Sequence, residues 1–383
     1  MAEQPKQQKR FAYIDWLRGL ACLMMFTVHG YDAWLSPALR EGQLYGWTQF
    51  MGSIPAPLFL FLAGVSLAVV TDRRRSKGLS ENRIAWMSVR RGLEILACGY
   101  LLRLQEFVLG WKTSVWTDLL RVDILNTIGL SIVFLGIVCW IARTRAAVIA
   151  LSTVLGVATA LATPPLYTTW RPRWLPWYLE SYINGVHTFD SPRAWLFPIF
   201  PWAGFAFAGL ALGFLLFSEW GRAHAWRAVT YAGVAGAAML GLARLFDTHG
   251  PAIYATYDYW HTSPNFFLAR VGVMMLMMPF AYAWCAWGAG DRGFEPVVQL
   301  GRTSLMVYWA HIIFVYGSFS LMRKEQQGIP MATLGIVVIT AAMLMLSLTT
   351  EAWEKAWPAR RDWWRKKLTS GNGATGDDAR TMA

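Results

Sequence analysis

Long apolar blocks alternate with short polar segments along most of the chain. These blocks predict membrane-spanning helices at about 17–35, 50–70, 92–110, 124–142, 146–163, 194–217, 227–244, 265–287, 303–320 and 331–350. A helix needs about 20 residues to cross roughly 30 Å of hydrocarbon, and the blocks have about this length. Several contain isolated polar residues, as expected of helices that line a polar interior. The pattern therefore predicts an all-α, polytopic membrane bundle with about ten transmembrane helices.

Lysine and arginine are distributed unevenly between the predicted loops. Most of the 35 basic residues fall in segments that share one side of the membrane if both chain ends are cytoplasmic: 1–16, 71–91, 143–145, 219–227, 288–302 and 351–383. Short cytoplasmic loops carry such an excess. We therefore predict cytoplasmic N- and C-termini. The net charge of +12 follows from this topology, and no nucleic-acid partner is expected, because the charges do not gather on one face.

Composition agrees with a membrane protein. Hydrophobic residues make up 55% of the chain and charged residues 15%, whereas soluble domains carry about 25% charged residues. The four cysteines all lie in apolar blocks without metal-ligand spacing: Cys22, Cys98, Cys139 and Cys285. We interpret them as small buried hydrophobic residues and expect no metal.

We divide the chain into a transmembrane bundle, 1–350, and a cytoplasmic tail, 351–383. The tail interleaves tryptophans with basic residues, which predicts an amphipathic helix on the lipids of an anionic inner leaflet. Its polar end, from Ser370, is expected to be disordered. Small-residue stretches such as 209–213 and 233–238 predict close helix packing, and the sequence leaves a homo-oligomer open.

Ionisable residues inside spans are costly and mark candidate sites. Arg18 and His29 are eleven residues apart, so they share a helix face at a distance of roughly 16 Å. Asp15 lies three residues before Arg18 and can pair with it. Simple anchoring of the helix start would explain Asp15 and Arg18, and a hydrogen bond to another helix would explain His29. The shared face favours a function.

A second group lies in the predicted ninth span. Ser304, Tyr308 and His311 share a face, although about 10 Å of helix rise separates Ser304 from His311 and disfavours a serine–histidine hydrolase. Helix packing explains this group equally well. Further candidates lie near the third and fourth spans: Glu94, Arg103, Glu106, Arg121, Asp123 and Asn126. We expect Arg103 and Glu106 to form a structural ion pair.

The predicted outer loop 164–193 is rich in proline and aromatic residues. One interpretation is an aromatic belt at the membrane interface. The other is a stacking platform for a sugar or another flat acceptor. In the second case the acceptor-binding residues would be Trp47, Trp174, Trp177, Tyr308 and Asn126.

Four stretches, 14–21 followed by His29, 56–64, 197–204 and 300–311, resemble the transmembrane acyltransferases. These include the acyltransferase-3 family and relatives of the catalytic domain of heparan-α-glucosaminide N-acetyltransferase. The resemblance implies transfer of an acyl group, usually acetyl, from cytosolic acyl-CoA to a hydroxyl or amine of an extracytoplasmic glycan or amino sugar. It also implies a bacterial inner membrane.

The resemblance suggests roles for individual residues. In acyltransferase-3 members an arginine and a histidine with ten residues between them mark the first span, and Arg18 and His29 match. His29 would act as general base or as acyl carrier, with His311 as a second catalytic candidate. Heparan-type members instead have their key histidine in the following outer loop, and 36–47 contains none. Either His29 takes this role, or the chain has lost that chemistry.

Basic residues near the predicted inner face are candidates to bind the phosphates of acyl-CoA. We assign this role to Arg18, Arg73, Arg74 and Arg91, and we include Asp15, which can pair with Arg18, in the same cofactor-binding group. The pantetheine arm would then reach from Arg18 towards His29.

Two other functions remain open. A transporter or flippase of lipid-linked sugars would also need polar groups inside the membrane, but the chain shows no internal repeat of the kind many transporters have. A non-catalytic scaffold would bind no acyl-CoA.

Overall fold

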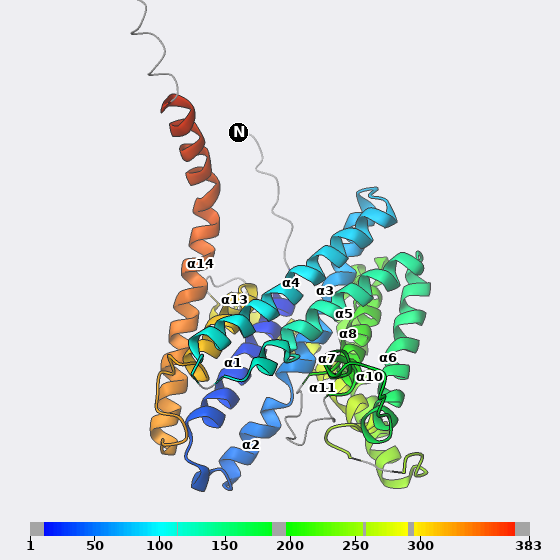
Figure 1. The fold of residues 1–383 in the computed structure, drawn as a ribbon. Helices are drawn as coiled ribbons and strands as arrows, with labels where there is room; N and C mark the ends of the chain where they lie inside the picture. Colours follow the sequence, from blue (N-terminus) through cyan, green and yellow to red (C-terminus); the bar gives the residue numbers. More distant parts are fainter. Residues whose placement is uncertain (1–10, 113, 186–196, 256–257, 290–294, 372–383) are drawn as a thin grey trace, which may run out of the picture.

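The computed structural model describes residues 11–112, 114–185, 197–255, 258–289 and 295–371. Over these ranges the chain is almost entirely helical, and the only β-pairing is an isolated bridge between Leu35 and Gln327. The prediction of an all-α bundle is confirmed for this part of the chain (Figure 1).

The helices follow one another along the chain as α1 (Ala12–Trp34), η1 (Pro37–Leu39), α2 (Gln43–Gly52), α3 (Pro55–Ser76), α4 (Glu81–Leu109), η2 (Trp116–Leu120), α5 (Ile124–Ile141), α6 (Arg145–Thr168), α7 (Trp177–Ile183), α8 (Ile199–Leu216), α9 (Glu219–Ala223), α10 (Ala225–His249), α11 (Pro264–Trp284), η3 (Cys285–Ala289), α12 (Pro296–Arg302), α13 (Ser304–Val315) and α14 (Ile329–Gly371).

Seven helical segments within the described ranges are long and apolar enough to cross a membrane. They are Gln43–Ser76, Trp116–Ile141, Arg145–Thr168, Ile199–Leu216, Ala225–His249, Pro264–Trp287 and Ile329–Ala356. The protein is therefore an integral membrane protein by its helices. The expected spans 17–35, 92–110 and 303–320 fall on α1, α4 and α13, which are not among the seven. α13 has 12 residues, about 18 Å of rise, so the count of ten stays a prediction.

Proline residues act differently at two of the predicted boundaries. Pro55 begins α3, within the predicted span 50–70, because proline is tolerated in the first turn of a helix. The predicted outer loop from 164, however, starts too early, because α6 continues through Pro164 and Pro165 to Thr168. Pro165 has no N–H for the carbonyl of Leu161, and the hydroxyl of Tyr254 donates to that oxygen at 2.9 Å instead.

α1 and α12 cross so closely that only glycine fits at the contact. A Cβ on Gly19 would lie 1.8 Å from the carbonyl oxygen of Val297, and one on Gly301 would lie 1.7 Å from that of Asp15. The predicted small face at Gly209 is used in the same way, against Phe61 of α3. Because α12 leads directly into α13, the crossing sets the position of α13 beside α1.

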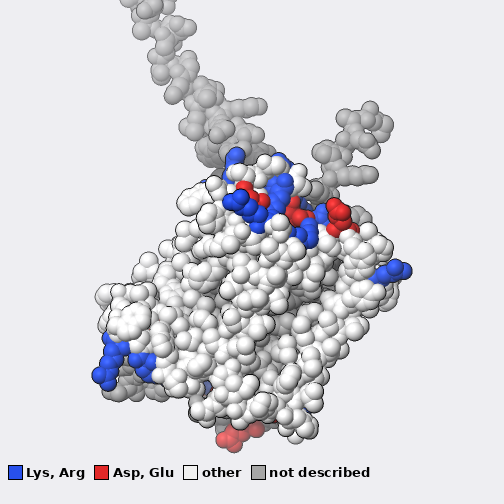
Figure 2. Space-filling view, turned by 90° about the vertical axis from the view of Figure 1, so that its right-hand side faces the viewer, with Lys and Arg blue, Asp and Glu red and all other residues white. Residues whose placement is uncertain are grey.

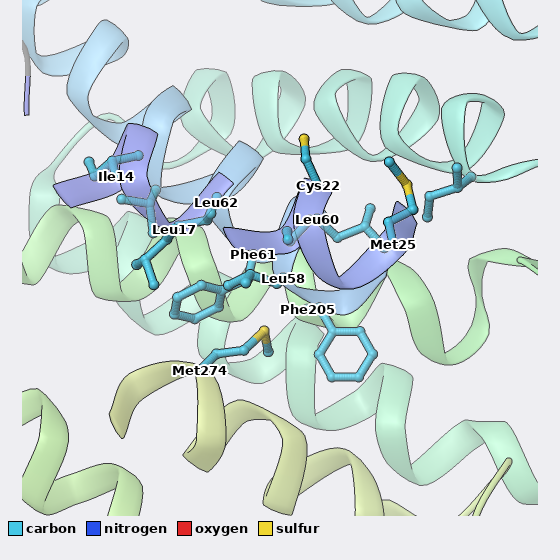
Figure 3. Packing of buried hydrophobic residues seen from close by; sticks show 14 of the residues in the cluster. Ile14, Leu17, Cys22, Met25, Leu58, Leu60, Phe61, Leu62, Phe205 and Met274 are labelled. Carbon is cyan, nitrogen blue, oxygen red and sulfur yellow. The ribbon is translucent and has the colours of Figure 1, made fainter. Parts of the chain in front are cut away.

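Apolar side chains of α1, α3, α8 and α11 fill the space between these helices (Figure 3). Leu17, Phe61 and Phe205 have no exposed surface, and Met274 is 1% exposed. All four cysteines have free thiols. The packing fixes α1 along its length before any polar contact is considered.

The end of α1 and the start of α14 lie together. The backbone N–H of Gln327 donates to the carbonyl of Trp34 at 2.8 Å, and the N–H of Glu325 donates to that of Ala33 at 3.0 Å. The two helices then run in opposite directions, so the start of α1 and the distal part of α14 lie at the same end of the bundle (Figure 1).

Charged side chains gather towards the two ends of one face of the molecule. Figure 2 shows a broad band between them that carries almost no charge. Such a band suits contact with lipid acyl chains. Which end faces the cytoplasm stays a prediction.

The backbone of α14 continues without a break across the predicted boundary between the bundle and the tail, as far as Gly371. Three predicted features lie wholly or partly outside the described part of the chain: residues 1–10 of the predicted cytoplasmic segment 1–16, the side chains of the amphipathic tail from residue 357, and residues 372–383 of the polar end predicted from Ser370.

Candidate active site

A cavity of about 620 Å³ opens between the end of α1, the start of α3, the end of α4, the start of α5 and the end of α13. This volume is in the range of small-molecule sites. Its apolar wall comes from several helices, including α1, α3, α8 and α13. Its polar lining consists of His29, Asp32, Arg103, Gln105, Glu106, Ser114, Arg121, Asp123, Tyr308, Tyr316, Ser318 and Lys324.

Two histidines from distant parts of the chain meet at this cavity. Nδ1 of His29 lies 2.9 Å from Nε2 of His311, and the two rings are stacked at 5.2 Å between centroids with 14° between their planes. His29 lines the cavity and keeps some exposure, whereas His311 is completely buried and does not line it. Of the two histidines, only His29 can therefore contact a molecule bound in the cavity.

Asp32 follows His29 by about one helical turn and lines the same cavity. Its carboxylate accepts a hydrogen bond from the hydroxyl of Tyr316 at 2.7 Å and another from that of Tyr45 at 3.1 Å. The ring of Tyr316 also packs edge-on against His29, with 5.2 Å between centroids. A negative charge is thus held in a fixed place near the imidazole.

The opposite wall carries an ion-pair network. Arg103 donates to Glu106 at 2.6 Å and to Asp123 at 2.5 Å, and its side chain is 13% exposed. The predicted Arg103–Glu106 pair is confirmed, but it belongs to a larger cluster that faces the cavity. The hydroxyl of Tyr308, on α13, lies 3.5 Å from Asp123, so the network extends to that helix.

Asp123 also caps the start of α5. Its carboxylate accepts from the N–H of Ile124 at 2.7 Å, while the side-chain oxygen of Asn126 accepts from the N–H of Asp123 at 3.1 Å. This reciprocal capping box satisfies the free N–H groups of the helix start. One residue therefore serves both the helix end and the cavity wall.

The predicted acceptor-binding residues separate into two groups. Tyr308 lines the cavity, and Asn126 is buried beside it with its amide donating to Tyr182 at 3.4 Å. Trp47 and Trp174 are 66% and 77% exposed and do not line the cavity. Trp177 is also outside it, with its ring edge-on to Trp116 at 5.9 Å.

None of the five predicted CoA-binding residues lines the cavity. Asp15 and Arg18 pair at 3.1 Å, as predicted, and Arg18 also donates to Ser66 at 2.6 Å. The remaining three lie on α3 and α4: Arg73 is exposed, Arg74 reaches Ser88 at 3.5 Å, and Arg91 pairs with Glu94 at 3.4 Å. Their role stays a prediction.

Asp32, Tyr316 and Lys324 line the cavity but were not predicted as site residues. The spacing of Asp32 from His29 is a signal that the sequence carries. Tyr316 and Lys324 follow α13, and no local pattern places that segment beside α1. Among the described residues, no group of three His, Cys, Asp or Glu side chains is arranged to hold a metal ion.

Comparison with protein families gives a match over residues 10–246, to the family described as heparan-alpha-glucosaminide N-acetyltransferase, catalytic. The match covers more than half of the chain and includes His29, Arg103 and Asp123. The chain belongs to this family. It is accordingly a membrane acetyltransferase, and the all-helical bundle agrees with that. His311 lies beyond the matched region.

The match supports only part of the expected resemblance. It supports the heparan-type relationship and not membership of the acyltransferase-3 family, so the Arg18–His29 spacing loses the family argument that suggested it. A search of curated proteins finds no match for this chain. A catalytic role for His29 therefore rests on the geometry of the cavity.

Proposed function

We propose that the protein transfers an acetyl group from cytosolic acetyl-CoA to an amine or hydroxyl of a glycan or amino-sugar acceptor on the far side of a bacterial inner membrane. We place the reaction in the cavity at His29. The observation that carries the proposal is that His29 lines a polar cavity in a chain of this family and is held by a second histidine.

His29 acts as the general base, the commonest role of an imidazole in catalysis. The acceptor nitrogen or oxygen attacks the carbonyl carbon of the thioester and gives its proton to His29. The bond between that carbon and the sulfur of CoA then breaks. The proton passes from His29 to the sulfur, so that CoA leaves as a thiol and His29 returns to its starting form.

The other cavity residues support this step. During the attack His29 carries a positive charge, and the carboxylate of Asp32, fixed by two tyrosine hydroxyls, stabilises it. The Arg103–Asp123 wall and Tyr308 offer donors and acceptors to the hydroxyl groups of a sugar. The lining is thus suited to a polar acceptor.

The donor approaches from the end of the bundle at which α1 starts, which we assign to the cytoplasm. Arg18, Arg73, Arg74 and Arg91 supply basic groups for the phosphates of CoA at this end. The thioester then has to reach His29 along α1, over the roughly 16 Å that eleven helical residues span.

The test compares acetyl transfer by purified wild-type protein, His29→Ala and His261→Ala in detergent, with acetyl-CoA and an amino sugar. His261 is the matched control, because it is 78% exposed and bonded to Asp258 away from the cavity. We expect His29→Ala to lose roughly 10²- to 10⁴-fold in kcat and His261→Ala to keep the wild-type rate.

A folded His29→Ala protein with wild-type turnover would contradict the role of His29. Substrate movement without any need for acetyl-CoA would replace the proposal with a transporter.

A further inference from the structure

We infer that His311 is a positioning residue that fixes the tautomer of His29, so that Nε2 of His29 is the basic atom. This inference rests on the proposed function of His29, but the arrangement of hydrogens that it predicts can be measured without any activity.

The hydrogen on His311 is assigned by its helix. Nδ1 of His311 lies 3.2 Å from the carbonyl oxygen of Val307, one turn earlier in α13. A carbonyl oxygen can only accept, so Nδ1 of His311 carries a hydrogen. The ring is completely buried, and an uncompensated charge there would be costly, so the ring is neutral. Its Nε2 therefore bears a lone pair and accepts.

The hydrogen on His29 follows from that of His311. Nδ1 of His29 faces the accepting Nε2 of His311 at 2.9 Å, so it must donate. A neutral imidazole has one N–H, which leaves Nε2 of His29 without hydrogen. Nδ1–H of His29 thus donates to Nε2 of His311, and Nδ1–H of His311 donates to the carbonyl of Val307. This is the one assignment that satisfies both contacts with two neutral rings.

The surroundings hold His311 in this orientation. Its ring packs against Phe26 at 5.2 Å and against Tyr308 at 5.4 Å between centroids. Phe26 has no exposed surface, so the ring of His311 has little room to turn. The acceptor atom offered to His29 therefore stays in place throughout the reaction.

The arrangement helps the reaction as well as the resting state. When Nε2 of His29 takes the proton, the bond from Nδ1 of His29 to His311 becomes charge-assisted and stronger. His311 thus stabilises the imidazolium of His29 without contacting the substrate. Orientation of one ring nitrogen by a hydrogen bond at the other is common for histidines at reactive sites.

The first measurement is the tautomer of His29 in wild-type protein labelled with ¹⁵N-histidine. The ring signals of the two residues are assigned by their loss in His29→Gln and His311→Gln. At a pH where both rings are neutral we expect the hydrogen of His29 on Nδ1. A hydrogen on Nε2 of His29 would overturn the inference while leaving the proposed activity of the protein untouched.

The second measurement compares His311→Gln with His311→Leu. The amide oxygen of glutamine can accept from Nδ1 of His29, and leucine cannot. We expect His311→Leu to lose roughly 10- to 100-fold in kcat with an unchanged KM for acetyl-CoA, and His311→Gln to recover most of the loss. Equal losses in two folded variants would also overturn the inference. If either variant fails to fold, the tautomer of the wild-type protein decides.

Discussion

Gly301→Ala tests whether the crossing of α1 and α12 holds the two histidines together. The added Cβ would lie 1.7 Å from the carbonyl oxygen of Asp15, whereas real Cβ contacts are essentially never below 3.0 Å. The helices must therefore separate by roughly 1 Å or more. Overpacking of this kind costs about 1–3 kcal/mol, against a gain of up to about 1 kcal/mol from replacing glycine in a helix.

The same displacement should reach the active site. α12 leads into α13, and a shift of that size would stretch the 2.9 Å contact between His29 and His311 beyond hydrogen-bond range. We therefore expect a lower thermal midpoint in detergent together with a fall in kcat. Gly241→Ala is the matched control, because nothing lies within 4 Å of its Cβ, and it should be as stable as wild type or more so. Wild-type stability and turnover in Gly301→Ala would refute the packing argument.

Three further substitutions each test one polar contact. Arg103→Met removes the cation that pairs with the buried carboxylate of Asp123 and the partly exposed one of Glu106, and it should cost about 3–5 kcal/mol, measured by thermal unfolding; an unchanged midpoint would contradict the network. Arg91→Met removes an exposed pair and should change stability by less than about 1 kcal/mol in the same assay. Tyr316→Phe removes one of the two hydroxyl donors to Asp32 and should lower kcat by roughly fivefold, so a wild-type rate would show that this hydrogen bond does not contribute to the reaction.

Features set by nearby residues could be predicted from the sequence. The Asp15–Arg18 pair and the Arg103–Glu106 pair each depend on residues within one helical turn. The periodicity of apolar blocks likewise predicts the helices, because it follows from the thickness of the bilayer.

The site itself depends on contacts that no local pattern contains. His29 and His311 are 282 positions apart, and their meeting depends on the glycine crossing between α1 and α12. Asp123 was expected only at the entrance to a span, yet tertiary packing places it in the cavity wall. Trp47 and Trp174, in contrast, were expected to bind the acceptor but lie outside the cavity. Aromatic composition alone cannot distinguish a membrane interface from a binding surface.

The number of membrane spans is likewise difficult to predict from local sequence, because it depends on helices that carry charged residues. α4 carries Arg103 and Glu106, and α1 carries Asp15 and Arg18, so neither has the uniform apolar composition of a lipid-facing helix. These polar residues make contacts inside the bundle that offset their cost. Helices that build a site are therefore the ones that hydropathy identifies least well.

Sided acetyl transfer in oriented proteoliposomes tests the central claim most directly. Acetyl-CoA is supplied only on the side of the start of α1, an amino-sugar acceptor only on the side of the cavity, and wild type is compared with His29→Ala. Acetylated acceptor in the cavity-side compartment, lost in His29→Ala, is the predicted result. Product formed only when both substrates share one compartment, or formed equally by His29→Ala, would contradict transfer across the membrane at His29.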